Sequence, residues 1–277
     1  MKGYFYGWYL KQLSSEGILA VIPSVSINGA GIIGNIQIIT QDDTFNFSNN
    51  TAAVDEKHGV IIVGKSVFTL SGFSLDIDEE HVIKGGVKFA DLTPLPRDIM
   101  GPFSLLGGME CAHMIKSMRH QVFGQVTIDG REYLFNGQNG YFEGDRGRRF
   151  PQSYVWAQGS SDRACITMAA GKIPVKKSSF TGVICAVLLN DKIHRFATYN
   201  GARLISADDG HICVRRGETE LCAYVEKAAP RPLKAPVDGE LRRTIYESPV
   251  CRVRFTLKTR GCVLMDFTDD NAGFERA

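Results

Sequence analysis

The sequence lacks the features that mark membrane-spanning, secreted and several enzyme classes. None of its apolar runs approaches the roughly 20 residues needed to cross a bilayer. Its first residues have neither the apolar core nor the small-residue cleavage site of a signal peptide. It also contains no P-loop, no Gly-x-Ser-x-Gly elbow and no His-Glu-x-x-His helix. We therefore expect no site of those three kinds.

A strong charge imbalance and paired cysteine motifs are missing as well. The 32 basic and 30 acidic residues leave a formal net charge of +2, which gives no strong attraction to nucleic acid or to an anionic membrane. The 7 cysteines are an odd number and form no Cys-x-x-Cys motif. Because most of them lie inside apolar runs, we expect reduced, buried thiols in a cytoplasmic protein, with no disulfide and no zinc site.

Helical periodicity is scarce, and short runs rich in Ile, Val, Phe, Tyr and Thr dominate instead. Asn28-Gly29, Asp129-Gly130 and Arg260-Gly261 each separate two such runs. Asn-Gly and Asp-Gly are the residues that tight type I′ hairpin turns favour. The pattern predicts an all-β sandwich or barrel built from meander hairpins.

Two proline-rich stretches interrupt this pattern. Residues 91–102 contain three prolines, and residues 229–236 contain three more. Such stretches favour connectors over strand interiors. We interpret the first as a domain boundary, which predicts an N-terminal β domain over 1–98 and a C-terminal β domain over 99–277. The second is predicted to be a loop within the later domain.

Two short motifs need weighing as ligand sites. Residues 29–34 match Gly-x-Gly-x-x-Gly, but a β-branched run follows them instead of a helix, so we expect a hairpin and not a dinucleotide site. Glu110, His113 and His120 are all capable of binding a metal. On one strand His113 and His120 would face opposite sides, so a buried, hydrogen-bonded Glu–His pair within this set is favoured over a metal site.

The segment 139–159, called the signature segment below, gathers the most chemistry. It holds two carboxylates, Glu143 and Asp145, together with three arginines and several glycines between two aromatic runs. Its glycines permit positive φ or close backbone approach. We expect a loop. It is either a surface loop pinned by Glu–Arg and Asp–Arg pairs, or a functional site in which charge lies beside apolar walls.

Residues 140–158, which read GYFEGDRGRRFPQSYVWAQ, resemble the signature of the tocopherol cyclase family. The stretches 7–11 (GWYLK), 109–120 (MECAHMIKSMRH) and 196–201 (FATYNG) agree with the same family, so the resemblance covers most of the chain. It implies two lipocalin-like antiparallel β-barrel or sandwich domains, with a pocket near the signature segment. One departure is marked, because Arg146 stands where the family has a tryptophan.

The resemblance implies a reaction in which a prenyl double bond is protonated and the resulting cation is captured by a neighbouring phenol oxygen. Such chemistry needs a protonated acid in an apolar surrounding and aromatic faces, but no cofactor and no metal. Glu143 is the expected acid, with Asp145, Glu110 and His113 as orienting groups. The expected substrate-binding residues are Trp8, Tyr141, Arg146, Trp156, Gln158 and Tyr199.

The leading functional hypothesis is therefore acid-catalysed cyclisation of a prenylated quinol or a similar hydrophobic substrate. The alternative is a non-catalytic carrier of such a molecule, and a third option is a structural protein with a filled core. The expected partner is a small hydrophobic molecule, with no nucleic acid and no transmembrane segment. If Arg146 points inward it would favour an anionic head group; if it points outward it forms an ion-paired rim and the family chemistry survives.

Overall fold

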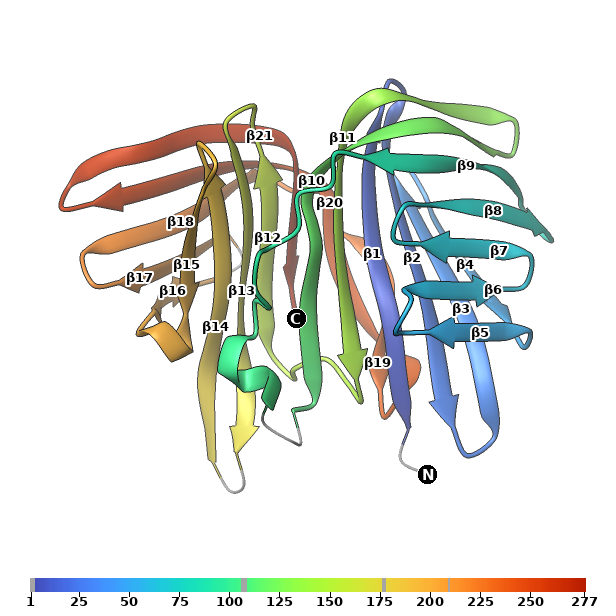
Figure 1. Cartoon of the computed structure of the whole chain (residues 1–277), viewed down its shortest axis with the longest axis horizontal. Helices are drawn as coiled ribbons and strands as arrows, with labels where there is room; N and C mark the ends of the chain where they lie inside the picture. Colours follow the sequence, from blue (N-terminus) through green and yellow to red (C-terminus); the bar gives the residue numbers. More distant parts are fainter. Residues whose placement is uncertain (1–2, 106–108, 176–177, 209) are drawn as a thin grey trace. The chain divides into compact units, whose positions relative to one another are not determined.

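The computed structural model describes residues 3–105, 109–175, 178–208 and 210–277, and strands dominate them (Figure 1). About 75% of the described residues lie in strands, which form one nearly closed barrel sheet and a second sheet. The described helical segments are two short 3-10 turns, η1 (Gly101–Leu105) and η2 (Thr198–Asn200). The expected all-β, two-domain, lipocalin-like fold is confirmed. The described residues contain no helix long and apolar enough to cross a bilayer.

The chain divides into two compact units that interleave along the sequence. The first unit comprises Met1–Pro96, Glu110–Phe150 and Lys234–Arg243; the second comprises Arg97–Met109, Pro151–Leu233 and Thr244–Ala277. This division differs from the expected single boundary near residue 98. Two long strands that follow the first proline-rich stretch return to the sheet of the N-terminal strands, a long-range pairing that local composition cannot reveal.

The first unit is an 11-stranded antiparallel sheet with the order β4-β3-β2-β1-β11-β10-β9-β8-β7-β6-β5. In Figure 1 the short strands β5 to β8 run across the direction of β1 to β3. The strands are β1 (Tyr4–Ser14), β2 (Gly17–Asn28), β3 (Gly31–Thr40), β4 (Thr44–Asn49), β5 (Ala52–Asp55), β6 (Val60–Val63), β7 (Ser66–Thr69), β8 (Gly72–Asp78), β9 (Val82–Ala90), β10 (Cys111–Ile128) and β11 (Arg131–Gly147).

The two faces of β1 and β11 differ in chemistry. Tyr6, Trp8 and Leu10 of β1 join Phe142 of β11 in the hydrophobic core of the first unit. The rings of Trp8 and Phe142 meet edge to face with their centroids 5.1 Å apart. Since side chains alternate along a strand, residues of the other parity, including Glu143, lie on the face opposite this core.

The predicted hairpins are confirmed. Asn28 pairs with Gly31, Ile128 with Arg131, and Thr259 with Cys262, so each hairpin has a two-residue turn. Two of these turns are the predicted dipeptides, whereas the first consists of Gly29 and Ala30, one residue later than expected. Asp129 and Gly130 have φ values of 48° and 85°, which a type I′ turn requires at both central positions. The Gly-x-Gly-x-x-Gly match at 29–34 accordingly belongs to a hairpin, as expected.

The second unit contains most of a 10-stranded sheet with the order β15-β14-β13-β12-β21-β20-β18-β17-β16, and β19 pairs with β20. Val155, Phe196 and Phe255 are among its buried core residues. The strands are β12 (Tyr154–Ser160), β13 (Ala164–Val175), β14 (Ser178–Leu189), β15 (Lys192–Ala197), β16 (Arg203–Ala207), β17 (His211–Arg216), β18 (Thr219–Lys227), β19 (Arg231–Val237), β20 (Glu240–Thr259) and β21 (Cys262–Arg276).

The cysteine prediction is partly wrong. Cys213 of β17 and Cys222 of β18 lie directly opposite each other and form a disulfide. Only the strand register brings them together, so neither the cysteine count nor the spacing could show the bond. Cys165 and Cys185 are buried thiols, as expected. Because disulfides persist mainly in oxidising compartments, the cytoplasmic expectation loses the support that it drew from reduced cysteines.

Candidate functional site

The signature segment is mostly strand, not the expected loop. It covers the end of β11 and most of β12, joined by residues 148–153. Its glycines permit close packing within strands: a Cβ on Gly144 would lie 2.8 Å from Cδ1 of Trp8, and one on Gly147, at φ 148°, would lie 2.2 Å from the carbonyl oxygen of Glu110. The same glycines that suggested a loop therefore let two strands approach other groups closely.

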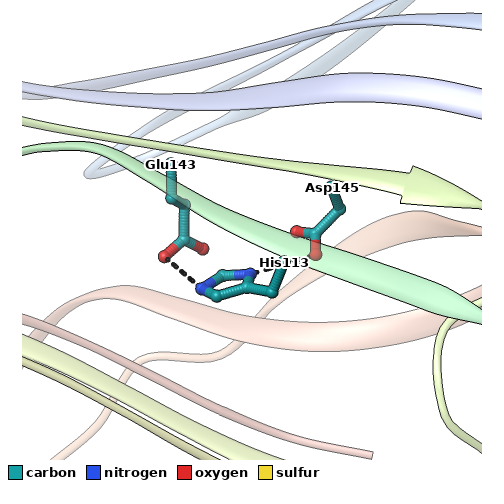
Figure 2. A group of neighbouring side chains, drawn as sticks. All are labelled: His113, Glu143 and Asp145. Carbon is teal, nitrogen blue, oxygen red and sulfur yellow. Dashed lines mark hydrogen bonds and ion pairs between the residues drawn. The ribbon is translucent and has the colours of Figure 1, made fainter. Parts of the chain in front are cut away.

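Three candidate residues meet on the face of the first unit's sheet opposite its core. His113 of β10 lies directly opposite Asp145 of β11. Its Nδ1 atom is 3.0 Å from Oδ1 of Asp145, and its Nε2 atom is 3.5 Å from Oε2 of Glu143. Figure 2 shows the imidazole ring between the two carboxylates, with one ring nitrogen toward each.

Two further side chains extend this group at its ends. The hydroxyl of Tyr141 donates a hydrogen bond to Oε2 of Glu143. At the other end, the thiol of Cys111 donates to Oδ1 of Asp145 over 3.3 Å. Burial, followed by the charge of Asp145, raises the pKa of Cys111 well above its ordinary value, so the sulfur keeps its proton. The five side chains form a connected row, called the proton row below.

Little water reaches the proton row. Tyr141 is 3% exposed and Glu143 is 6% exposed, while the side chains of His113 and Asp145 are 12% and 20% exposed. Hydrogen bonds between such groups meet little competition from solvent, and those that involve a charged partner are the stronger ones. The row can therefore hold a proton and pass it between its members.

The same three residues could be considered as ligands of a metal ion. Suitable atoms of His113, Glu143 and Asp145 all lie within 4.8 Å of one another. However, the two carboxylates face different nitrogens of one ring, and an ion can bind only one of those nitrogens. An ion on Nε2 would have Glu143 as its second ligand and Asp145 only as the group that orients the ring. The arrangement fits proton transfer better than a metal centre.

Arg146, the departure from the family signature, does not face Glu143. It lies opposite Tyr6 and has the parity of the core residues, whereas Glu143 has the other parity. Its guanidinium is half-exposed and pairs with Glu56 over 3.0 Å. Tyr4 donates a hydrogen bond to the same carboxylate. Arg146 thus forms the ion pair that was expected for an arginine pointing away from the site. Its contacts do not support the predicted role in substrate binding.

The other two arginines hold the connection after β11. Arg148 and Arg149 pair with Asp238 over 2.9 Å and 2.6 Å, and Nε of Arg149 lies 3.6 Å from Glu110. The expected pair of Glu110 with a histidine is not formed: the carboxylate of Glu110 lies beside Arg149, and His113 lies between Glu143 and Asp145. The arginines of the signature segment therefore form ion pairs, as the first of the two interpretations expected. Their acidic partners, however, lie outside the segment.

The two histidines of β10 diverge, as the strand parity predicted. His120 pairs with Gly140 and lies against Phe89 of the core, with ring centroids 4.4 Å apart. Its Nε2 atom is 3.2 Å from Oε1 of Gln12. Burial lowers the pKa of His120 to about 4. This histidine is neutral at neutral pH and belongs to the interior of the first unit.

The remaining predicted binding residues have separate settings. Trp8 belongs to the core of the first unit. In the second unit, Trp156 and Gln158 are buried on β12, and Trp156 lies opposite Glu275 of β21. Tyr199 donates a hydrogen bond to the carbonyl oxygen of Ile99 over 3.1 Å, so its hydroxyl fastens η2 to the segment before η1.

Three residues on the same face as the proton row were missed from the sequence. Tyr9 and Lys11 of β1 lie directly opposite Glu143 and Tyr141, and Cys111 reaches Asp145. Tyr9 and Lys11 belong to the GWYLK stretch. In this stretch they alternate with the core residues Trp8 and Leu10. This alternation could have predicted their position, because successive side chains of a strand point to opposite faces of the sheet.

Comparison with known proteins gives a fold but no sequence family. No protein-family model matches the chain, and no curated protein matches its sequence. Three solved structures match nearly all of it: CghA with Sch210972 (TM-score 0.60, 11% identity, 99% of this chain and 88% of that chain), a candidate AttH from Nitrosomonas europaea (0.56, 11%, 100% and 92%), and kievitone hydratase from Nectria haematococca (0.55, 9%, 99% and 87%).

These structures have the tocopherol cyclase-like lipocalin fold. At identities of 9% to 11% the likeness concerns the fold alone. The resemblance noted in the sequence is thus supported at the level of the fold, and the chain shares the all-β, two-domain architecture of CghA and kievitone hydratase.

Proposed function

We propose that the protein is an acid–base enzyme that protonates a carbon–carbon double bond of a small hydrophobic molecule and thereby cyclises it. The observation that carries this proposal is the proton row, in which Asp145, His113, Glu143 and Tyr141 are linked in sequence with little exposure to water. A prenylated quinol, whose phenol oxygen stands near an alkene, is the substrate that the sequence resemblance favours.

Each member of the row has a role in this reaction. Glu143 donates its proton to the alkene carbon and becomes a carboxylate. The hydroxyl of Tyr141 donates a hydrogen bond to its Oε2 atom, which stabilises the negative charge that develops in the transition state. Nε2 of His113 faces the same oxygen. Asp145 accepts a hydrogen bond from Nδ1 of His113, which fixes the orientation and the tautomer of the ring.

The reaction balances without an oxidant or a reductant. A C–H bond forms at one alkene carbon, and the other carbon becomes a cation. The phenol oxygen then forms a C–O bond to that cation and loses its proton, which returns to the Glu143 carboxylate. Substrate and product are isomers, and the acid is regenerated in the same cycle.

The fold comparisons support an enzyme, since one structure with this fold is named a hydratase and another was solved with the small molecule Sch210972. The positions of the arginines also support it. The charge at Arg146 is matched by Glu56 on the other face of β11, so it opposes neither a protonated Glu143 nor a forming cation.

The experiment is an incubation of the purified protein with a geranyl-substituted hydroquinone in deuterated water, under argon. Alkene protonation leaves one non-exchangeable deuterium in the chromanol, which mass analysis separates from carried-over material. Enzyme-dependent label supports the proposal. Tight binding without label would favour the carrier hypothesis, and absence of both would reject this substrate class.

A further inference from the structure

Three side chains at one hairpin of the second unit form a hydrogen-bonded chain that the proposed function does not use. Nδ1 of His211 on β17 lies 2.8 Å from Oδ2 of Asp208, and its Nε2 atom lies 2.8 Å from Oγ of Ser206 on β16. The order is therefore hydroxyl, imidazole and carboxylate. In this arrangement a serine can act as a nucleophile with a histidine as its base.

The bonding of Asp208 decides which nitrogen of the imidazole carries the proton. Its Oδ1 atom accepts from the backbone N–H groups of Gly210 and His211 over 2.7 Å and 3.0 Å. The hydrogen bond from Gly210 and the pairing with His211 lower the pKa of Asp208, so its side chain is a carboxylate that can only accept. In the neutral ring Nδ1 then carries the proton, which leaves Nε2 as the acceptor for the hydroxyl of Ser206.

Closure of the turn accounts for the Asp208–His211 pair but not for the serine. Asp55 and His58 have the same i, i+3 spacing, and Nδ1 of His58 lies 2.7 Å from Oδ2 of Asp55. No hydroxyl among the residues that the structure describes forms a hydrogen bond with Nε2 of His58. Ser206 therefore adds a contact that an Asp–His turn does not require.

The strand β16 presents Ser206 in a way that suits attack on a carbonyl group. Its register with β17 shifts between Leu204 and Ser206, and such a bulge redirects the side chains beside it. Among the described strands β16 stands last in the order of its sheet, so its outer edge offers backbone N–H groups to the oxygen of a tetrahedral intermediate. Ser206 and His211 are both partly exposed, so a solute can reach them.

An aromatic ring and a disulfide border the serine. Tyr224 of β18 lies opposite His211, with the two ring planes 14° apart and the centroids at 6.0 Å. Tyr224 is 42% exposed, so its ring can contact an apolar or aromatic group of a substrate. Ser206 lies opposite Cys213, whose disulfide to Cys222 fixes β17 against β18. The disulfide thus holds His211 and Tyr224 in register beside the serine.

We propose that Ser206 is the nucleophile of a separate active site, which hydrolyses small esters with an apolar or aromatic group. Oγ of Ser206 forms a bond to the ester carbonyl carbon while its proton moves to Nε2 of His211. The bond from that carbon to the leaving oxygen breaks, and the leaving oxygen takes the same proton. Water then attacks the acyl-serine with His211 as the base, which releases the acid and restores the hydroxyl. This inference goes beyond the proposed function and does not depend on it.

The test uses an alkyl fluorophosphonate, which forms a stable bond to an activated serine and releases fluoride. Mass analysis of the intact protein detects the adduct, and peptide mapping locates it. We expect the adduct on Ser206. The unchanged protein should also release nitrophenol from p-nitrophenyl butyrate, and prior reaction with the fluorophosphonate should stop that release.

Two pairs of variants separate chemistry at the serine from closure of the turn. Ser206→Ala should abolish the labelling, whereas Ser74→Ala, at an exposed serine on β8, should leave it unchanged. His211→Gln should slow the labelling of Ser206 at least about 100-fold, whereas His58→Gln should not. Melting curves check that each variant is folded. Mapping of the adduct in the unchanged protein needs no variant, so the test stands even if Ser206→Ala does not fold.

Four results would overturn the inference. The unchanged, folded protein could take up no adduct, or the adduct could lie on another residue. His211→Gln could be labelled as fast as the unchanged protein, in which case His211 only closes the turn and its loss lowers the melting temperature alone. Finally, labelling of Ser206 without hydrolysis of the ester would show that the serine transfers no acyl group.

Discussion

Replacement of Asp145 by asparagine tests whether the proton row works as a unit. Asp145 does not face Glu143 directly; its Oδ1 atom accepts from Nδ1 of His113 over 3.0 Å and from the thiol of Cys111 over 3.3 Å. Asparagine keeps the shape and removes the charge. Nδ1 of His113 then loses its charged acceptor, which fixes the tautomer of the ring, and the ring supports the acid at Glu143 less well.

The size of the effect follows from this hydrogen bond. A bond to a charged group contributes about 1.5–3 kcal/mol. If all of that support is needed in the transition state, the rate of protonation falls about 10- to 150-fold, since about 1.4 kcal/mol corresponds to a tenfold change. Binding of the hydroquinone should change little, because asparagine keeps the shape of the side chain.

The assay is single-turnover incorporation of deuterium into the chromanol, with enzyme in excess over the hydroquinone. Asp76→Asn is the control, because Asp76 is an exposed aspartate on β8 of the same sheet. An Asp145→Asn protein that is folded and as fast as the unchanged protein would refute the reasoning, since Asp145 would then have no part in positioning His113.

Three further outcomes are expected. Arg146→Trp should leave the rate unchanged, because Arg146 lies on the face of β11 opposite Glu143 and its exposed ion pair contributes at most about 1 kcal/mol; a faster variant would contradict this geometry. Phe142→Ala should lower the free energy of unfolding in urea by about 3–5 kcal/mol, whereas Phe123→Ala, at a residue that is 43% exposed, should lower it by less than about 1 kcal/mol. Burial lowers the pKa of His120 to about 4, so the unfolded chain binds more protons than the folded one between about pH 6.5 and 4. The free energy of unfolding should therefore fall by about 3 kcal/mol as the pH drops through that range. In urea unfolding, His120→Gln should lack this part of the loss.

Local signals in the sequence predicted the strands and their turns well. Alternating β-branched runs and the dipeptides at 129–130 and 260–261 act over a few residues, and the hairpins formed where they were expected. The divergence of His113 and His120 also agrees with strand parity. The register of β10 shifts twice between them, and the two shifts together leave the rings on opposite faces.

Features that depend on distant pairing could not be predicted. The pairing of β1 with β11 gives the first unit its interleaved boundaries and places Lys11 beside Tyr141. The register of β17 and β18 creates the Cys213–Cys222 disulfide. Composition marked Glu143 and Asp145 as unusual, but only the register of β10 with β11 brings His113, and not Glu110, between them.

The most direct test of the account is a comparison of the unchanged protein with Glu143→Gln in deuterated water. Glutamine has nearly the same shape and can accept from Tyr141, but it has no acidic proton to donate. The account predicts one enzyme-dependent deuterium in the chromanol with Glu143 present, and loss of that label with glutamine while the fold and hydroquinone binding persist. Label that forms equally fast in both proteins would contradict the assignment of Glu143 as the acid.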